Sequence, residues 1–288
     1  MAALCEVLGL PSSTYYAAKH REANPSPRAV RDEELRVEIR RVWKGKGRRL
    51  YGAKKVWQLL RREGVEVARC TVERLMREDG SCGVVGSRRR PRTTLPGDPP
   101  GRPADLVERD FRAPAPNQPW VTDITYVELA DGGFCYAAFV TDAFSRAIVG
   151  WQVADSLRTE LALDALEMAL WARQDTLSAA LVHHGDRGVQ YTAIRYAQRL
   201  AEAGIERSVG RKGDSYDNAL AESVNALYKK EVIAQVESWQ DVAAVMTATA
   251  EWVSWYNTER LHSWCGYRPP LEFEQAFWEG WRAQPRAA

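Results

Sequence analysis

The sequence has few cysteines and no long apolar run. Its five cysteines form no CxxC pair and no spacing typical of a metal site. An odd, scattered set indicates reduced thiols in a cytosol rather than a disulfide framework. No apolar run reaches the 18 residues of a membrane-spanning helix, and the start of the chain lacks a signal-peptide pattern. We therefore expect a soluble, cytosolic protein with no membrane partner.

The chain is also not a disordered one, and its charge is unevenly distributed. A length of 288 residues allows about two domains, and an apolar content of 45% with 11 Trp is enough to form real cores. Residues 1–100 contain 22 Lys/Arg against 12 Asp/Glu, whereas the remaining residues contain 18 against 26. A basic front half suits a polyanionic partner, and an acidic back half suits a fold that concentrates carboxylates. A chance division of surface charge would give the same totals.

The front of the sequence predicts a small all-helical domain. Residues 1–28 favour a short helical segment, and residues 29–84 contain three amphipathic helical patterns. Two of these are joined by a tight turn at Gly64, which is typical of a helix-turn-helix whose later helix lies in the major groove. That helix would offer three arginines to DNA: Arg69, Arg74 and Arg77. A plain helical domain with solvated arginines remains the alternative.

A basic linker separates this domain from the rest. Residues 85–116 combine a Pro/Gly cluster with a run of arginines, so they are not expected to bury a core. An extended basic tether of this kind can follow a phosphate backbone, and its candidate contacts are Arg88, Arg89 and Arg90. A solubilising hinge explains the same composition.

The back of the sequence predicts an α/β domain. Three runs with β-rich character suggest an antiparallel meander, and they are followed by alternating helices and strands. The order β-β-β-α-β-α-β-α is that of a ribonuclease-H-like fold with a mixed sheet. We assign residues 117–236 to this core and residues 237–288 to a C-terminal helix and tail of the core. That helix is expected to begin with a capping box from Ser238 to Asp241.

Three carboxylates occupy suggestive places in this layout. Asp123 lies on the first strand, Asp186 just past the fourth, and Glu222 on the helix after the fifth. The first and fourth strands are neighbours in this fold, and a helix packed across them can aim a carboxylate at the same point. Three such groups stay ionised together only when cations neutralise them. Hard oxygen ligands select Mg²⁺ or Mn²⁺, and two such ions about 3.5–4 Å apart can promote an in-line phosphoryl displacement.

Each carboxylate also has a less specific interpretation. A lone Asp on a strand is usually a surface residue or the neighbour of a turn, and we interpret Asp142, Asp155 and Asp164 in this way. Glu222 could equally be a surface charge on the outer side of its helix. His183 and His184 precede Asp186, but a structural role is favoured because hard Mg²⁺ prefers oxygen ligands.

Several motifs in order carry a resemblance to a known family. "WVTDITYV", "HHGDRGVQYTAIRYAQRLAEAGIERSVGRKGDSYDNALAES" and "YNTERLHSWCGYRPP" resemble the OrfB-type transposases of bacterial insertion sequences in the third insertion-sequence family. "LYGAKKVWQLLRREGVEVARCTVERLMRE" resembles their helix-turn-helix region, and the likeness runs from about residue 3 to about residue 275. It implies a retroviral-integrase-like core with a D,D-35-E triad, and 35 residues separate Asp186 from Glu222. By this resemblance Asp123, Asp186 and Glu222 are the catalytic ligands of two Mg²⁺ or Mn²⁺ ions.

Further basic residues are candidate DNA contacts around the triad. Arg211 and Lys212 precede the catalytic helix, and Lys229 and Lys230 follow Glu222 by two turns. We expect these residues to form a cationic patch beside the site, although a solvated face is the alternative for the lysines. The resemblance places two more candidates in its YNxxRxH motif, Arg260 and His262.

The sequence departs from the family pattern at two positions. Gly185 stands where a serine commonly precedes the second Asp, and Cys265 stands where a leucine is usual. The first departure is expected to loosen the loop and the second to weaken packing at the back of the core. Neither change touches the triad.

The sequence therefore predicts a DNA transposase that cleaves the ends of its element and transfers the freed 3′-OH to target DNA. The resemblance implies a homo-oligomer on terminal inverted repeats and target DNA, in the bacterial cytoplasm and associated with the nucleoid. It also implies an upstream helix-turn-helix protein, supplied separately or by frameshift fusion. Two alternatives remain: a non-catalytic DNA-binding regulator with a domesticated, relic core, and a ribonuclease H-type hydrolase of RNA·DNA hybrids, which typically uses four carboxylates.

Overall fold

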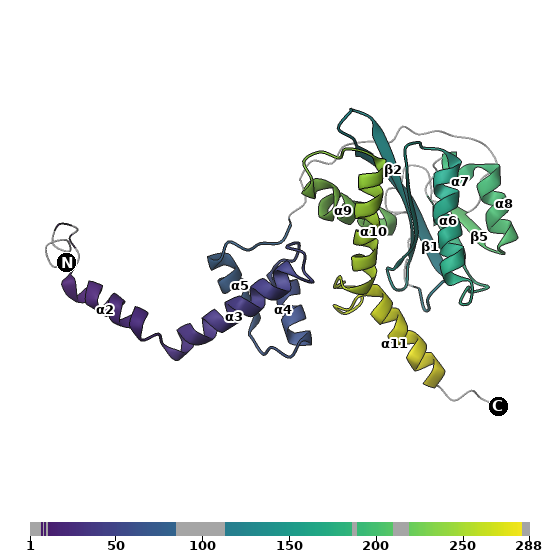
Figure 1. The fold of residues 1–288 in the computed structure, drawn as a ribbon. Helices are drawn as coiled ribbons and strands as arrows, with labels where there is room; N and C mark the ends of the chain where they lie inside the picture. Colours follow the sequence, from purple (N-terminus) through teal and green to yellow (C-terminus); the bar gives the residue numbers. More distant parts are fainter. Residues whose placement is uncertain are drawn as a thin grey trace. The chain divides into compact units, whose positions relative to one another are not determined.

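The computed structural model describes residues 7, 9, 11–84, 113–185, 189–209 and 219–283. The chain divides after Val84 into two compact units, which are treated separately below (Figure 1). Among the described helices, none has both the length and the apolar character needed to cross a membrane.

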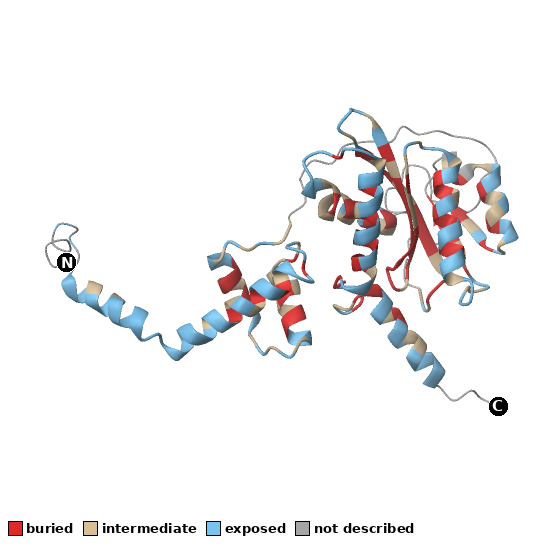
Figure 2. Cartoon of the chain, in the orientation of Figure 1, coloured by how far each residue is buried: buried red, intermediate tan, exposed pale blue. Residues whose placement is uncertain are grey.

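The N-terminal unit is all-helical. Its helices are α2 (Ser12–Ala23), α3 (Pro27–Lys44), α4 (Ala53–Arg62) and α5 (Arg69–Glu78). Helix α3 starts sharply because the hydroxyl of Ser26 accepts a hydrogen bond from the Ala29 N–H at 3.2 Å and proline occupies the first turn. Helix α2 buries no residue (Figure 2). The other three pack around one apolar core: Leu35, Ile39, Val42, Val56, Leu59, Leu60, Val72, Leu75 and Met76.

The connection from α4 to α5 forms the turn of a helix-turn-helix-like unit. Gly64 has φ of +81°, a left-handed conformation that glycine adopts without a steric penalty. The indole N–H of Trp57 donates to the Val67 carbonyl at 2.9 Å and so ties the turn to α4. The turn thereby sets how α5 follows α4.

The C-terminal unit contains a five-stranded mixed sheet in the order β3-β2-β1-β4-β5. The strands are β1 (Pro119–Glu128), β2 (Phe134–Asp142), β3 (Ile148–Ala154), β4 (Val182–Gly185) and β5 (Glu206–Val209). The first three are antiparallel, as the meander pattern predicts, and β4 and β5 are added in parallel. This mixed sheet and its helices confirm the ribonuclease-H-like prediction.

The register of β1 and β4 determines which part of β1 stays at an edge. Strand β1 pairs with β2 from Trp120 opposite Asp142 to Glu128 opposite Phe134. Its ladder with β4 ends where Thr122 lies opposite Gly185. Past Thr122, the described strands leave one side of β1 without a partner strand.

Helices cover both faces of the sheet (Figure 1). One face carries α6 (Thr159–Arg173), α7 (Val189–Thr192) and α8 (Ile194–Glu202), and the other carries α9 (Ala219–Glu231) and α10 (Val242–Thr258). Alternation along β2 explains the two layers, since Ala138 and Val140 join the core under α6 while Phe139 contacts Tyr228 and Trp252 on the opposite side.

The C-terminal region differs from the prediction in two respects. The N-cap of α10 is Asp241, whose carboxylate accepts from the Ala244 N–H at 2.7 Å, so the predicted capping box beginning at Ser238 is wrong. A second helix, α11 (Pro270–Ala283), follows the single one expected. Its aromatic side chains hold it to the core, because Phe144 packs against Phe273 and Phe277 at centroid distances of 5.1 and 5.0 Å. A short 3₁₀ turn, η1 (Ile233–Gln235), connects α9 to this region.

Candidate active site

Asp123 lies on β1 just past the last residue paired with β4. Its carboxylate is partly buried, and donors on β1 and on α9 bind its two oxygens. Oδ1 accepts from the Ile124 N–H at 2.9 Å, and Oδ2 accepts from the side-chain amide of Asn225 on α9 at 2.8 Å. A carboxylate on the sheet is thus tied directly to the helix that carries the predicted third ligand.

Three polar residues of α9 share one face of the helix, and two of them contact β1. Glu222, Asn225 and Lys229 are three and four residues apart, a spacing that places them on the same side of a helix. Glu222 is exposed and lies in the first turn, where the helix dipole favours a negative charge. Ala221 beside it is buried, as the small residues of this stretch predict for a helix packed closely on a sheet. The contact from Asn225 therefore brings the Glu222 end of α9 to the strand that bears Asp123.

Lys229 lies farther along the same face. Its ammonium group is 4.4 Å from the centroid of the Tyr126 ring, a cation–π contact with β1. Partial burial lowers the pKa of Lys229, and the charge of Asp123 opposes that shift. Lys230 is also partly buried. Contact of either lysine with DNA stays a prediction.

Asp186 and several predicted DNA contacts lie outside the described residues: Arg88, Arg89, Arg90, Arg211 and Lys212. The strand leading to Asp186 is described, and Gly185 pairs with Thr122, the residue before Asp123. A Cβ added at Gly185 would lie 3.1 Å from Cγ2 of Thr122, so this position has little room for a side chain. Within the described ranges, no three His, Cys, Asp or Glu side chains are grouped as a metal site requires. Of the predicted triad, only Asp123 and Glu222 belong to those ranges.

The two histidines before Asp186 are buried in the sheet. His183 bonds through Nε2 to the hydroxyl of Tyr196 at 3.0 Å, and His184 bonds through Nδ1 to the hydroxyl of Ser208 at 2.8 Å. Burial, with a smaller contribution from His184, lowers the pKa of His183 to about 3. These contacts agree with the structural role favoured for them.

Arg260 and His262 require a correction, because both side chains lie in the interior. Arg260 is 5% exposed and forms a two-pronged ion pair with Glu231 at the end of α9, with nitrogen–oxygen distances of 2.7 and 2.9 Å. His262 is 7% exposed and packs edge-on against Tyr256 at a centroid distance of 4.4 Å. Since neither can reach DNA without opening the core, we assign this pair a structural role.

The arginines of α5 also differ from one another. Arg74 donates to both oxygens of Asp32 at 2.8 and 2.9 Å, which binds α5 to α3. Arg69 is exposed and pairs with Glu73 on its own helix at 2.7 Å. Arg77 is exposed and forms no ion pair with any described residue. Arg77 and Arg69 thus remain the better candidates for DNA contact, while Arg74 already has two internal acceptors.

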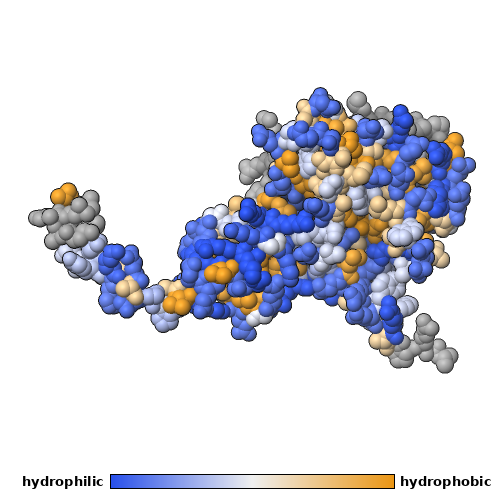
Figure 3. Space-filling model, viewed as in Figure 1, coloured by the Kyte–Doolittle hydropathy of each residue, from blue (hydrophilic) through white to orange (hydrophobic). Residues whose placement is uncertain are grey.

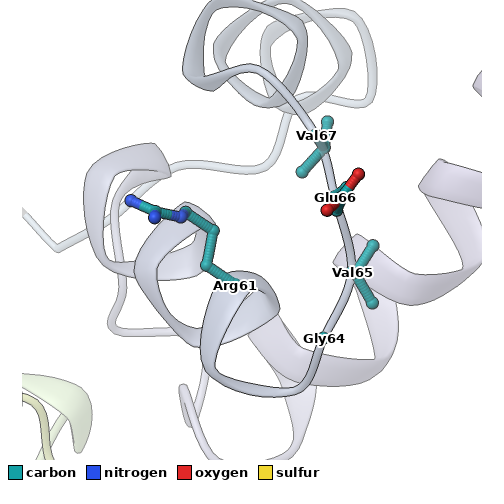
Figure 4. A pocket seen from close by; sticks show the side chains of 5 residues that line it. All are labelled: Arg61, Gly64, Val65, Glu66 and Val67. Atoms are coloured by element: carbon teal, nitrogen blue, oxygen red, sulfur yellow. The ribbon is translucent and has the colours of Figure 1, made fainter.

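A cavity of about 400 Å³ lies beside the turn between α4 and α5. Figure 4 shows Arg61 of α4 on one side of it and residues 65–67 on the other. The visible face of this unit is mostly hydrophilic (Figure 3). No residue of the predicted triad lines this cavity, so it belongs to the helix-turn-helix-like unit and not to the carboxylate site.

Asn225 is the site residue that the sequence predictions missed. It is 8% exposed and contacts Asp123 directly. Its position three residues after Glu222, on a helix expected to pack over the first strand, is the pattern that could have indicated it.

Comparison with known proteins adds three family matches. Two integrase core domain models match residues 113–215 and 203–270, and an HTH-like domain model matches residues 30–91. The chain is 52% identical over 269 residues to a Mycobacterium tuberculosis protein described as "Putative transposase for insertion sequence element IS986/IS6110", covering 92% of this chain and 95% of that one. It is 47% identical over 282 residues to the Shigella sonnei transposase for insertion sequence element IS629, covering 96% and 91%.

Among solved structures, the HTLV-2 integrase catalytic core domain in complex with magnesium aligns with a TM-score of 0.44 and 13% identity. That alignment covers 57% of this chain and 99% of the integrase chain.

Proposed function

Because the chain belongs to the OrfB-type transposases of the third insertion-sequence family, we propose that Asp123, Asp186 and Glu222 are its catalytic carboxylates. The protein is an insertion-sequence transposase, a polynucleotidyl transferase with an integrase core and an HTH-like domain that implies DNA binding. The observation that most strongly supports our assignment is the hydrogen bond from Asn225 to Asp123. It joins the helix that bears Glu222 to the strand that bears the first carboxylate.

The donor set fits hard divalent cations. Carboxylate oxygens are the ligands that Mg²⁺ and Mn²⁺ prefer, and the nearby imidazoles are already engaged inside the sheet. Asp123 and Glu222 belong to elements in contact, and the β1–β4 ladder ends one residue before each of the two aspartates. Two ions bound there would supply charge neutralisation and activation of the attacking oxygen.

The proposed chemistry consists of two in-line displacements at one site. In cleavage, a water oxygen attacks the phosphorus at the element end, and the P–O3′ bond breaks to leave a 3′-OH and a 5′-phosphate. In joining, that 3′-hydroxyl oxygen attacks a phosphorus of target DNA, and the P–O3′ bond of the target breaks. The carboxylates hold their positions through both steps, and no covalent enzyme intermediate is required.

The remaining residues are proposed to hold DNA. Arg69 and Arg77 would contact the terminal inverted repeats from α5, and the arginines before the core would follow the phosphate backbone. Lys229 and Lys230 would lie beside the cleaved phosphate. We further propose that the protein works as a homo-oligomer at the nucleoid in the bacterial cytoplasm, together with an upstream helix-turn-helix protein or as a frameshift fusion to it.

The test is cleavage of a labelled duplex that carries the terminal repeat, with Mg²⁺ or Mn²⁺ and with the upstream protein supplied. We expect the wild type to nick the repeat at its end and Asp123→Asn to lose at least about 100-fold in rate while binding the duplex normally. Asp164→Asn is the matched control, because this exposed aspartate lies on α6, on the other face of the sheet.

The same assay separates the alternatives. Cleavage by Asp123→Asn at the wild-type rate would contradict the carboxylate assignment. Binding of the repeat without metal-dependent cleavage by any variant would favour the regulator. Faster cleavage of an RNA·DNA hybrid than of the repeat duplex would favour the ribonuclease H-type hydrolase.

A further inference from the structure

We propose that Asn225 is a positioning residue that orients Asp123 for metal binding, an inference that rests on the proposed function of Asp123. The amide nitrogen of Asn225 donates to Oδ2 of Asp123 at 2.8 Å from across the contact between α9 and β1. The Ile124 N–H donates to the other oxygen at 2.9 Å. Because the two donors approach different oxygens, they fix the plane of the carboxylate relative to both the strand and the helix.

The orientation of the Asn225 amide follows from chemistry. A carboxylate only accepts hydrogen bonds, so Asp123 must face the NH₂ group and not the carbonyl oxygen of the amide. The carbonyl oxygen, Oδ1, then points into the interior, where it is fully buried without a hydrogen-bond partner in the described part of the chain. Among the described residues, the amide is therefore bonded at the end that faces the site and not at the other end.

An amide that is hydrogen-bonded at its NH₂ end and not at its carbonyl end indicates a positioning role for Asn225 and not simple packing. A residue retained only for stability would satisfy both ends of its amide or be apolar, as its buried neighbours Ala221 and Val224 are. Asn225 instead satisfies the end that faces Asp123. It also lies one turn after Glu222, so one hydrogen bond couples the placement of both proposed ligands. Groups that orient metal ligands in this way typically change metal affinity by about 10- to 100-fold when removed.

The test measures Mn²⁺ binding to the full chain by the loss of the electron paramagnetic resonance signal of free Mn²⁺, beside thermal unfolding without metal. Asn225→Leu keeps the branched shape, removes the donor and also removes the carbonyl oxygen. We expect its apparent Kd for Mn²⁺ to rise about tenfold, and its Tm shows whether the variant is folded. Tyr228→Phe is the matched control. Tyr228 lies on α9, as Asn225 does, and its hydroxyl forms a buried 2.7 Å hydrogen bond with Thr249 of α10. The variant removes this bond, so we expect a lower Tm with unchanged Mn²⁺ affinity.

Asn225→Ser, whose hydroxyl is too short to reach Asp123, takes the place of the leucine variant if that variant does not fold. Wild-type Mn²⁺ affinity in a folded Asn225 variant, with binding lost in Asp123→Asn, would overturn this inference and leave the proposed function intact. Wild-type affinity in Asp123→Asn as well would remove Asp123 from the ligands, and the role of Asn225 would fall with it.

Discussion

The aromatic ring of Tyr126 restricts the position of the Lys229 ammonium group at this site. The ammonium group lies 4.4 Å from the ring centroid of Tyr126 and on the α9 face that carries Asn225 and Glu222. Cation–π contacts contribute about 0.5–1 kcal/mol at exposed sites and about 2 kcal/mol when the cation is desolvated, and Lys229 is partly desolvated. The ring therefore limits the positions that the ammonium group can occupy beside Asp123.

Replacing Tyr126 with Leu removes the ring, and replacing it with Phe keeps it. If Lys229 contacts the DNA end, Tyr126→Leu should weaken binding of the terminal-repeat duplex about fivefold, corresponding to about 1 kcal/mol. Tyr126→Phe should bind as the wild type does. A fluorescence anisotropy titration at fixed salt measures both, and equal affinities for all three proteins would show that the ring does not position Lys229 for DNA.

His183 gives the protein a defined sensitivity to acid. Its pKa is lowered to about 3 by burial, against about 6.5 in an unfolded chain, so the unfolded state binds the proton more readily. This contribution to stability is complete above pH 6.5 and is lost as the pH falls toward 3. By pH 5 it amounts to a loss of about 2 kcal/mol. His183→Asn should reduce the slope of unfolding free energy against pH between 7 and 5, measured by urea denaturation; an unchanged slope would contradict the buried neutral histidine.

Single residues were also the hardest feature to predict from sequence. Asp123 was indicated by its place on the first strand and by the family resemblance, and Glu222 by its spacing from Asp186. Asn225 was not indicated, because one asparagine in a helix has no pattern of its own. Asp142 was interpreted as a surface or turn residue. It is fully buried, accepts N–H groups from Asn117, Phe144 and Ser145, and has a pKa raised by burial. The number of donors that converge on a carboxylate depends on the folded loop and is not written in the local sequence.

At the scale of elements, helix α6 depends on a glycine of the strand beneath it. A Cβ on Gly150 would lie 2.1 Å from the Ala165 carbonyl oxygen and 2.8 Å from the Ala169 nitrogen. Both are backbone atoms of the helix, so the helix itself would have to move. Strand β3 and helix α6 can pack at this distance only because position 150 has no side chain.

We expect Gly150→Ala to lower the free energy of unfolding by about 3 kcal/mol or to prevent folding, because overpacking displaces backbone. Gly280→Ala is the control, since nothing lies within 4 Å of its added Cβ and the position is in α11, where alanine should be neutral or stabilise by up to about 1 kcal/mol. Urea denaturation of both variants measures their free energies of unfolding. Equal stabilities would mean that α6 is not packed as closely as described.

The far end of α9 is anchored by a buried charge pair. Arg260 binds both oxygens of Glu231, and the Trp252 indole donates to the same carboxylate at 3.1 Å. Removing only one charge leaves the other buried and unpaired, which costs about 3–5 kcal/mol. We expect Arg260→Met to lose about that much stability and the double change with Glu231→Met to regain most of it.

A double-mutant cycle measured by denaturation gives the coupling between the two residues. Reduced DNA affinity in Arg260→Met without a loss of stability would return Arg260 to the DNA contacts and contradict its structural role. The strand and helix order of this unit was predictable from local sequence patterns, since β1 tends to alternate, β2 and β3 are β-rich runs, and α6 and α8 have helical apolar spacing. The interior position of Arg260 was not, because a charged residue in a loop motif looks the same whether it binds a partner or a buried carboxylate.

At the scale of the whole molecule, a helical HTH-like unit and an integrase core are carried on one chain. Residues 1–100, which include the whole helical unit, are basic, and the remaining residues are acidic. The fold class and the family were predictable because several motifs occur in order along nearly the whole chain. Which arginines of α5 are already paired internally was not predictable, since Asp32 and Arg74 are 42 residues apart and belong to different helices.

The central claim is that one carboxylate site performs strand transfer, and the most direct measurement is joining of a pre-cleaved repeat. A labelled duplex that ends in the freed 3′-OH is incubated with a target plasmid, Mn²⁺ and the upstream protein, using either wild type or Glu222→Gln. We predict that the wild type joins the end to the plasmid. Glu222→Gln should bind the duplex equally but lose joining by at least about 100-fold, because it keeps the size of the side chain and removes its charge. Joining by Glu222→Gln at the wild-type rate would contradict the account.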